Sequence, residues 1–278
     1  MRILFLFLVS IYGLVGCVSE PISVRQSVIQ YKVFDVKQRA FISYDSFIEQ
    51  LNQTHLILLG ETHDQYLHHK AEQQLVADLL ANKRLNSVML EMLPSSQQAV
   101  LLKAQLTLRK QQVKDSTVVK QLLRWNDEWD WRQYADLVTL VATSEIGLYG
   151  ANLNQKEINT LWSGAYPLNG NISTSTVVKQ RLKNLMLSYA SEHHSLEMQP
   201  ESINKLVEIQ QFKDRRMAET LIKQPKPSVL IAGRYHVSKS FGVPLHLQDY
   251  QYSNYQVIIF TDKLDSIKEE EADYIWIL

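Results

Sequence analysis

The sequence predicts an α/β fold: a mostly parallel sheet flanked by helices, with a helical cap or insertion. Short apolar runs alternate with longer stretches of helical periodicity, as in parallel strands joined by right-handed crossovers. Most runs are continuously apolar, which is typical of strands buried on both faces of a sheet. The segment 154–224 has helical periodicity and no convincing strand, so it predicts the cap.

Strand and helix alternate from the first elements onward. Apolar residues at helical spacing predict helices at 43–52 and 65–82, and a third helix begins just after Pro94. The charged run 268–271 is expected in a solvated loop or on a helix face. The predicted strands, in chain order, span residues 28–33, 55–60, 87–92, 146–152, 227–233, 255–260 and 274–277.

The densest aromatic cluster of the chain lies in the segment 125–142. A spacing of four residues places Trp125 and Trp129 on one helix face, and Trp131 and Tyr134 follow closely. The usual role of such rings is packing against a sheet. We therefore expect a helix whose aromatic face belongs to the core.

The composition excludes several classes of protein. The chain has 29 Lys and Arg residues and 29 Asp and Glu residues, and the basic residues are scattered, so a nucleic-acid partner is not expected. Cys17 is the single cysteine, which leaves the domain without a disulfide or a nucleophilic thiolate. The sequence also lacks a glycine-rich phosphate loop and a Gly-x-Ser-x-Gly motif, which argues against common nucleotide enzymes and serine hydrolases.

The N-terminal segment has the features of a bacterial lipoprotein signal. The apolar stretch after Arg2 is shorter than the roughly 20 residues that cross a bilayer, and Leu14-Val15-Gly16-Cys17 forms a lipobox. We expect a signal peptide at 1–16 and a lipidated Cys17. Acyl chains such as palmitate contribute about 0.8 kcal/mol per buried CH₂, enough together to hold a protein on a membrane.

This N-terminus also sets the expected domain organisation and location. A lipidated tether at 17–38 would precede one α/β domain at 39–278, with the helical insertion at about 154–224. Val18 and Ser19 follow the cysteine, and the absence of Asp there resembles lipoproteins of the outer membrane. The expected location is the bacterial cell envelope, with a lipid anchor in what we take to be the outer membrane.

Two predicted strands end in the same motif. Gly60-Glu61-Thr62-His63 and Gly233-Arg234-Tyr235-His236 both place Gly-x-x-His where a strand ends, and Glu91 and Asn152 close two further strands. The carboxyl ends of parallel strands form the crevice where ligands bind. We expect Glu61, His63, Glu91, Asn152 and His236 to converge there, either as a ligand or catalytic site or as groups that bond one another.

Two other histidine clusters have weaker signals. His68, His69 and Glu72 lie one turn apart and could share a metal ion, but the His-Glu-x-x-His order of a zinc protease is absent, so we favour a solvated helix face. His193 and its neighbour His194 lie in the helical segment, where the sequence is equally compatible with an exposed helix surface and with a functional role.

Short motifs occur in a fixed order along nearly the whole mature chain. They are Gly60-Glu61-Thr62-His63-Asp64, Glu91-Met92-Leu93, Trp129-x-Trp131-x-x-Tyr134, Gly150-Ala151-Asn152-Leu153, Lys213-Asp214-Arg215-Arg216-Met217-Ala218 and Ala232-Gly233-x-x-His236 with Gly242-Val243-Pro244. Each motif is weak alone, but the ordered set resembles the ChaN family of iron-regulated, haem-binding lipoproteins. That family lies within the Tiki/TraB and erythromycin-esterase-like superfamily.

The resemblance implies haem capture in the envelope during iron acquisition, by a homodimer that encloses two haems. It also implies that a tyrosinate holds each iron and that histidine meets the propionates; tyrosinate oxygen is a hard ligand suited to ferric iron. No motif identifies the tyrosine, so the candidates are Tyr166, Tyr189 and Tyr134 in that order, with His193 as a candidate histidine. An outer-membrane haem receptor is a candidate partner.

The superfamily leaves an alternative open. In a metal-dependent hydrolase of the Tiki or erythromycin-esterase type, His63 or His236 would be a general base, with Glu61 or Glu91 as a second acid-base group or a ligand of a divalent metal. A third possibility is a pure interaction module for an outer-membrane receptor. We expect a haem-binding protein in preference to an enzyme.

Overall fold

The structure is a computed structural model that describes residues 32–192 and 199–278, the side chains of 189–192 excepted. Cys17, His193 and the side chain of Tyr189 therefore lie outside the described residues. The strands are β1 Lys32–Asp35, β2 Ala40–Ile42, β3 Leu56–Glu61, β4 Ser87–Pro94, β5 Gly147–Asn152, β6 Ser228–Gly233, β7 Tyr255–Thr261 and β8 Tyr274–Ile277. The α-helices are α1 Tyr44–Leu51, α2 Tyr66–Ala81, α3 Gln98–Gln111, α4 Ser116–Leu123, α5 Trp131–Thr143, α6 Gln155–Trp162, α7 Thr176–Glu192, α8 Pro200–Lys223, α9 Arg234–Val237 and α10 Val243–Asp249, and three short 3₁₀ helices are η1 Ser95–Gln97, η2 Leu264–Ser266 and η3 Glu269–Glu271.

The described strands form one sheet in the order β2-β1-β8-β7-β3-β6-β4-β5. All pairings from β8 to β5 are parallel, whereas β1 pairs antiparallel with both β2 and β8. The predicted mostly parallel α/β fold is thus confirmed. Because β1 begins at Lys32, the sheet includes part of the segment that we expected to be a tether.

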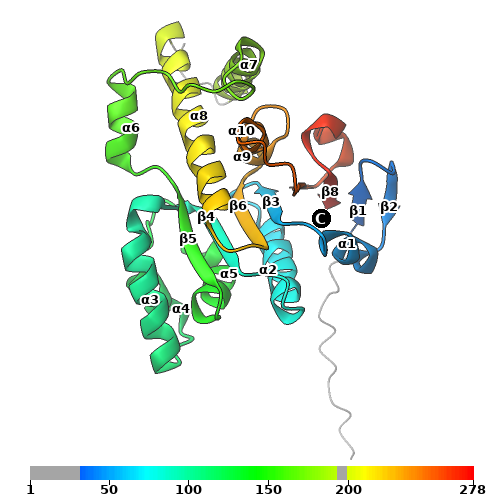
Figure 1. The fold of residues 1–278 in the computed structure, drawn as a ribbon, viewed down its shortest axis with the longest axis vertical. Coiled ribbons are helices and arrows are strands. Elements are labelled where there is room, and N and C mark those ends of the chain that lie inside the picture. Colours follow the sequence, from blue (N-terminus) through cyan, green and yellow to red (C-terminus); the bar gives the residue numbers. More distant parts are fainter. Residues whose placement is uncertain (1–31, 193–198) are drawn as a thin grey trace, which may run out of the picture. The chain divides into compact units, whose positions relative to one another are not determined.

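Helices cover both faces of this sheet, as Figure 1 shows. One core contains side chains of α1 to α5 packed on alternate strand residues such as Ile57 and Leu59. The other contains side chains of α8 and α10 packed on Leu56 and Leu58. Because neighbouring residues of a strand point to opposite faces, a continuously apolar strand serves two cores.

The predicted helical insertion consists of α6, α7 and α8, which we call the cap. Pro200 occupies the first turn of α8, where the missing N–H costs no helical hydrogen bond. A small third core joins α7 and α8 to the segment around Phe241. The upper part of α8 and the whole of α6 and α7 extend beyond the strand ends (Figure 1).

The aromatic segment differs from the prediction. α5 begins only at Trp131, and Trp125 and Trp129 lie in the turn before it, so they do not share a helix face. Arg124 ends α4 in the left-handed region at φ 53°, and Asp130 caps α5 by accepting the backbone N–H of Arg132. Local capping therefore overrides the helical spacing of the two tryptophans, although Trp125 is buried in the core as expected.

Three helices escaped the prediction, α4, α9 and α10, because each has eight residues or fewer and gives too short a stretch for a helical pattern to stand out. Among the described residues, none of the helices has the length and apolarity needed to cross a bilayer.

Candidate functional site

Strand register brings the two Gly-x-x-His motifs side by side. β3 and β6 are parallel neighbours in which Gly60 pairs with Ala232 and Glu61 with Gly233. β4 lies on the other side of β6, so Glu91 arrives at the same end of the sheet. Its Oε2 accepts the backbone N–H of Gly233 at 2.8 Å. We call Glu61, His63, Glu91 and His236, together with Tyr134 and Asp214, which bond to them, the strand-end site.

Glu61 and His63 form a hydrogen-bonded pair in which only the histidine reaches solvent. Nδ1 of His63 bonds Oε1 of Glu61, whose side chain is fully buried while that of His63 is 42% exposed. The hydroxyl of Tyr134 donates to the same Glu61 oxygen at 3.1 Å. The Trp129 ring packs against the His63 ring at a centroid distance of 4.7 Å. Nδ1 is thus occupied, and Nε2 remains for a proton or a ligand.

Two opposing effects act on the pKa of His63. Burial alone would lower the pKa of His63, but the bond to Glu61 and the charges of Glu61 and Glu91 outweigh burial and raise it. Burial and the nearby carboxylates raise the pKa of Tyr134 far above its usual range. Tyr134 is therefore a neutral hydrogen-bond donor in this arrangement.

His236 lies between two carboxylates on different elements. Its Nε2 is 3.1 Å from Oε1 of Glu91 on β4, and its Nδ1 is 2.5 Å from Oδ1 of Asp214 on α8. The side-chain amide of Gln210 also lies 2.9 Å from Nδ1. Both ring nitrogens face carboxylate oxygens, and with a proton on each, as an imidazolium, the ring can donate to both.

Charge stabilises that assignment. Burial would lower the pKa of His236, yet the charges of Glu91 and Asp214 raise it to about 10. In turn, His236 holds the pKa of Glu91 below its usual range against the effect of burial. Burial raises the pKa of Asp214 to about 6 despite the same partner. His236 is therefore a fixed cation that ties α8 to β4, and it is poorly suited to be a general base at neutral pH.

The expectation of a solvated face for His68, His69 and Glu72 is wrong. All three side chains are buried, and Glu72 is fully so. Nδ1 of His69 lies 3.0 Å from Oε2 of Glu72, and its Nε2 lies 3.1 Å from the backbone oxygen of His63. His68 accepts the backbone N–H of Thr62 at 3.0 Å. These residues hold the turn that carries His63, because α2 packs its polar side against the end of β3.

Three further predicted residues are described by the structure, and two of them lie outside the strand-end site. Asn152 is buried at the end of β5, where its side chain accepts the backbone N–H of Leu153, and it makes no hydrogen bond to the strand-end site. Tyr166 lies on the loop after α6 and is 95% exposed, which fits the exposed turn expected there. Tyr134 belongs to the strand-end site and is only 1% exposed, so an iron cannot reach its oxygen without rearrangement.

Sequence reasoning assigned no site role to Asp214, and for His69 and Glu72 it favoured a solvated helix face over a metal site. Asp214 lies in one of the motifs that carry the family resemblance, but nothing in its spacing connects it to His236. His69 and Glu72 have the spacing of an interacting helix pair, and only burial distinguishes that pair from a surface pair.

No group of three or more metal-ligating side chains has the geometry to hold a metal ion within residues 32–192 and 199–278. Two carboxylate oxygens of the strand-end site, Oε2 of Glu61 and Oδ2 of Asp214, are buried without a hydrogen-bond partner among the described residues. The site thus has the chemistry of a proton-exchanging pair, Glu61 and His63, beside a fixed charge at His236.

The comparisons with known proteins identify the family. The family model described as haem-binding uptake, Tiki superfamily, ChaN matches residues 47–247. The chain belongs to the ChaN family. The structure of ChaN of Campylobacter jejuni, determined with cofacial haem binding, is 35% identical, with a TM-score of 0.81 over 89% of this chain and 96% of that one. The expected resemblance to ChaN is confirmed.

More distant solved structures are also similar to this ChaN-family chain. An erythromycin esterase in its open conformation has 12% identity and a TM-score of 0.47, covering 84% of this chain and 77% of that one. A MARTX toxin effector domain from Vibrio vulnificus has 14% identity and a TM-score of 0.42, covering 77% of this chain and 35% of that one. No curated protein matches the sequence.

Proposed function

We propose that this chain binds haem on its cap and takes part in haem or iron acquisition at the cell envelope. The observation that carries the proposal is the family relationship, with a model match over residues 47–247 and 35% identity to a protein whose structure shows cofacial haem binding. At that identity and coverage, a shared ligand class is the simplest expectation. The cap then has to supply an iron ligand and an apolar surface.

Residues of the cap fit the chemistry of haem. Tyr166 presents a phenol oxygen to solvent, and tyrosinate is an established ligand of ferric haem. When bound, haem supplies a ferric centre and a flat apolar ring that needs apolar neighbours and polar groups at its edge. Large apolar side chains on or beside the cap are exposed, namely Trp162, Ile172, Val177 and Leu187.

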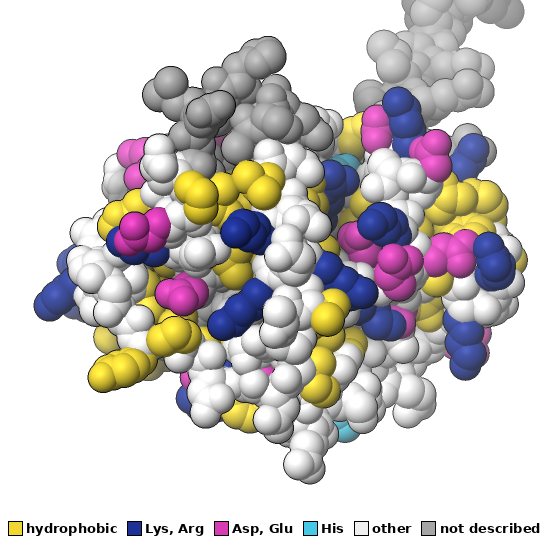
Figure 2. Space-filling model, turned by 90° about the horizontal axis from the view of Figure 1, so that it is seen from above, with side chains coloured by type: hydrophobic (Ala, Val, Ile, Leu, Met, Phe, Trp, Pro, Cys, Tyr) yellow, Lys and Arg dark blue, Asp and Glu magenta, His cyan; other side chains and the backbone are white. Residues whose placement is uncertain are grey.

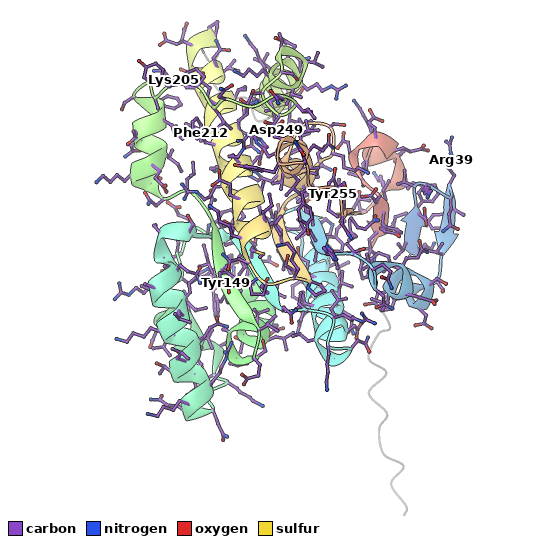
Figure 3. All side chains as sticks on the ribbon, viewed as in Figure 1. Arg39, Tyr149, Lys205, Phe212, Asp249 and Tyr255 are labelled. Atoms are coloured by element: carbon purple, nitrogen blue, oxygen red, sulfur yellow. The ribbon has the colours of Figure 1, made fainter. Side chains whose placement is uncertain are left out.

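The side of α8 that faces α6 carries Phe212 between two basic residues. Arg216 bonds Glu157 of α6 at 2.7 Å, and Lys205 lies over the Trp162 ring at 5.7 Å, so both residues mark the side that faces α6. Phe212 has the helical spacing to lie on that side between them. Figure 3 shows Lys205 and Phe212 toward α6. Lys205 adds a cation near Phe212, where a carboxylate of the ligand can be met.

A haem titration followed by absorbance tests the proposal. We expect saturable binding with a tyrosinate-type ferric spectrum, and Tyr166→Phe should remove that spectrum. Tyr66→Phe is the matched control, because Tyr66 is also exposed but lies on α2 outside the cap. Absence of saturable binding to the unaltered chain would contradict the function, whereas an unchanged Tyr166→Phe spectrum would eliminate only this tyrosine.

Haem loading is also expected to bring two chains together. In the Campylobacter protein the haems are cofacial, an arrangement in which two rings face one another. Sedimentation of the chain with and without haem should show a shift from monomer to homodimer. A loaded chain that remains monomeric would contradict the dimer but leave haem binding intact.

The envelope location rests on the lipobox that ends at Cys17. Palmitate labelling of expressing cells should mark the wild-type chain and not Cys17→Ser, and membrane fractionation should place only the wild type with the outer membrane. Labelling of both forms would exclude Cys17 as the anchor. A haem receptor of the outer membrane is the partner that this location favours.

A second candidate function is hydrolysis at the strand-end site. The observation that favours it is the half-exposed His63, whose Nδ1 is held by buried Glu61 and whose Nε2 is left for a proton. Turnover of chromogenic esters should then be lost in His63→Ala, with or without added divalent metal. His55→Ala, an exposed histidine elsewhere, is the control. Equal rates in both variants would exclude His63 as a base.

A further inference from the structure

The loop that joins α6 to α7, residues 163–175, has two unlike halves. Its first part is mostly exposed and carries Tyr166, and no side or main chain lies within 4 Å of where a Cβ of Gly164 would be. Its last part enters the protein, so that Ser173 is fully buried. The conformation of the exposed half therefore depends on how the buried half is held.

Asp249, at the end of α10, holds the buried half. Its Oδ1 accepts the backbone N–H groups of Ile172 at 2.7 Å and Ser173 at 3.4 Å. Its Oδ2 accepts the Ser173 hydroxyl at 2.6 Å. These bonds outweigh burial and lower the pKa of Asp249, so it acts as an anion that gathers the loop.

Arg215 on α8 completes this arrangement. Its Nη2 donates to Oδ2 of Asp249 at 2.8 Å, and the two side chains are 13% and 6% exposed. Its Nε donates to Nδ1 of buried His246 at 3.1 Å, and burial together with the Arg215 charge lowers the pKa of His246 to about 3. The Tyr250 ring lies 5.1 Å from the guanidinium. Arg215 is thus fixed on three sides, which gives Asp249 a rigid partner.

The loop fits closely against this pair. A Cβ at Gly170 would lie 2.5 Å from Oδ2 of Asp249 and 2.8 Å from Nη2 of Arg215, so any larger residue would have to displace this pair. Gln211 donates to the backbone oxygen of Ser173 at 2.9 Å. We call Gly170, Ser173, Arg215 and Asp249 the loop clamp.

The other end of the segment is held by the next residue of α8. Arg216 bonds Glu157, which forms a capping box with Asn154 at the start of α6. Two adjacent arginines therefore fix α6 at one end and the loop at the other. Asp214, just before them, binds His236 of the strand-end site. The turn of α8 at 214–216 thus connects the sheet, α6 and the loop.

We infer that Arg215 and Asp249 are positioning residues that fix the loop bearing Tyr166 for haem binding. The inference rests on the proposed function. A loop held at both ends needs little further ordering when the ligand binds, and a loop released at one end loses affinity because it must be ordered first. The strand-end site then contributes to the cap through Asp214, even without chemistry of its own.

The test uses the full chain with Asp249→Asn, which removes the charge and turns an NH₂ group either toward Arg215 or toward the backbone N–H groups of Ile172 and Ser173, so that one set of donors loses its acceptor. Glu269→Gln is the control, because Glu269 pairs with Arg39 at 2.8 Å, the same distance as in the pair of Asp249 and Arg215. Figure 3 shows Arg39 far from the cap. We expect Asp249→Asn to weaken haem binding roughly tenfold and to speed hydrogen exchange at the amides of 170–175, with sheet amides unchanged. Glu269→Gln should change neither.

Ser173→Ala is a second, milder variant that removes only the hydroxyl bond, with exposed Ser163→Ala as its control. It should shift exchange and affinity in the same direction as Asp249→Asn by a smaller factor. Wild-type affinity in both clamp variants would overturn the inference, as would unchanged exchange at 170–175. Failure of the unaltered chain to bind haem would instead overturn the proposed function, and the two failures are therefore distinguishable.

Discussion

Nε2 of His236 lies 3.1 Å from Oε1 of Glu91, although Glu91 is 145 residues earlier in the chain. The opposite nitrogen of the ring faces Asp214, so one buried imidazolium joins a strand end to the cap helix. All three side chains of this triad are buried. Its removal should therefore be costly.

We expect His236→Asn to lower the free energy of unfolding at pH 7 by roughly 3–5 kcal/mol, because it leaves two buried carboxylates without their cation. Chemical denaturation measures the loss. His55→Asn is the control and should change stability by less than about 0.5 kcal/mol, since His55 is exposed. A loss below about 1 kcal/mol in His236→Asn would mean that the ring is not charged in the folded state.

The same triad predicts a pH dependence. The pKa of His236 is raised to about 10, above the unfolded value of about 6.5. A raised pKa means that its stabilisation is complete below pH 6.5 and is lost as pH rises through 10. The stability difference between wild type and His236→Asn should therefore narrow from pH 7 to pH 10. Denaturation at several pH values in this range measures it, and a constant difference would contradict the protonation assigned to His236.

The two strand-end glycines should respond differently to alanine. A Cβ at Gly60 meets the Val237 side chain and lies 3.0 Å from the backbone Cα of Arg234, which cannot yield. A Cβ at Gly233 meets only the edge of the His63 ring at 3.0 Å, and that ring is partly exposed. We expect Gly60→Ala to cost about 1–3 kcal/mol by overpacking, and Gly233→Ala to cost less.

Trp129 provides the second readout for that pair. The Trp129 ring contacts His63. A shift of His63 in Gly233→Ala should therefore change tryptophan fluorescence, while the loss of stability stays small. Equal stability losses in the two variants would show that His63 cannot move to accommodate the added methyl group.

A further prediction concerns the edge strand β5. Gln105 of α3 accepts the backbone N–H of Leu148 and donates to the backbone oxygen of Ile146, both at 3.0 Å, and thus occupies groups that another strand would use. Gln105→Ala should cost about 1–3 kcal/mol and raise aggregation on partial denaturation, because the edge becomes free to pair. Light scattering measures the second effect, with exposed Gln111→Ala as the control. Equal scattering in both variants would contradict edge protection.

Some features followed from local sequence. Continuous apolar runs ending at Gly60 and Gly233 predicted buried parallel strands, because a strand covered on both faces can hold few polar residues. The repeated Gly-x-x-His predicted that His63 and His236 would share one end of the sheet. These predictions succeeded because strand periodicity and the direction of parallel strands are set by short segments.

Other features depended on the tertiary structure. The spacing of His69 and Glu72 does not distinguish a buried helix face from an exposed one, so the sequence predicted a surface pair. Only packing of α2 against β3 buries it. Asp214 becomes the partner of His236 through the docking of α8 on the sheet, which no local pattern encodes. The parallel sheet, the family and the strand-end histidines could be predicted from local patterns, whereas the charge on His236 and the residues that clamp the Tyr166 loop became clear only in the folded chain. Charge states and loop positions depend on burial and on partners that are distant in the sequence.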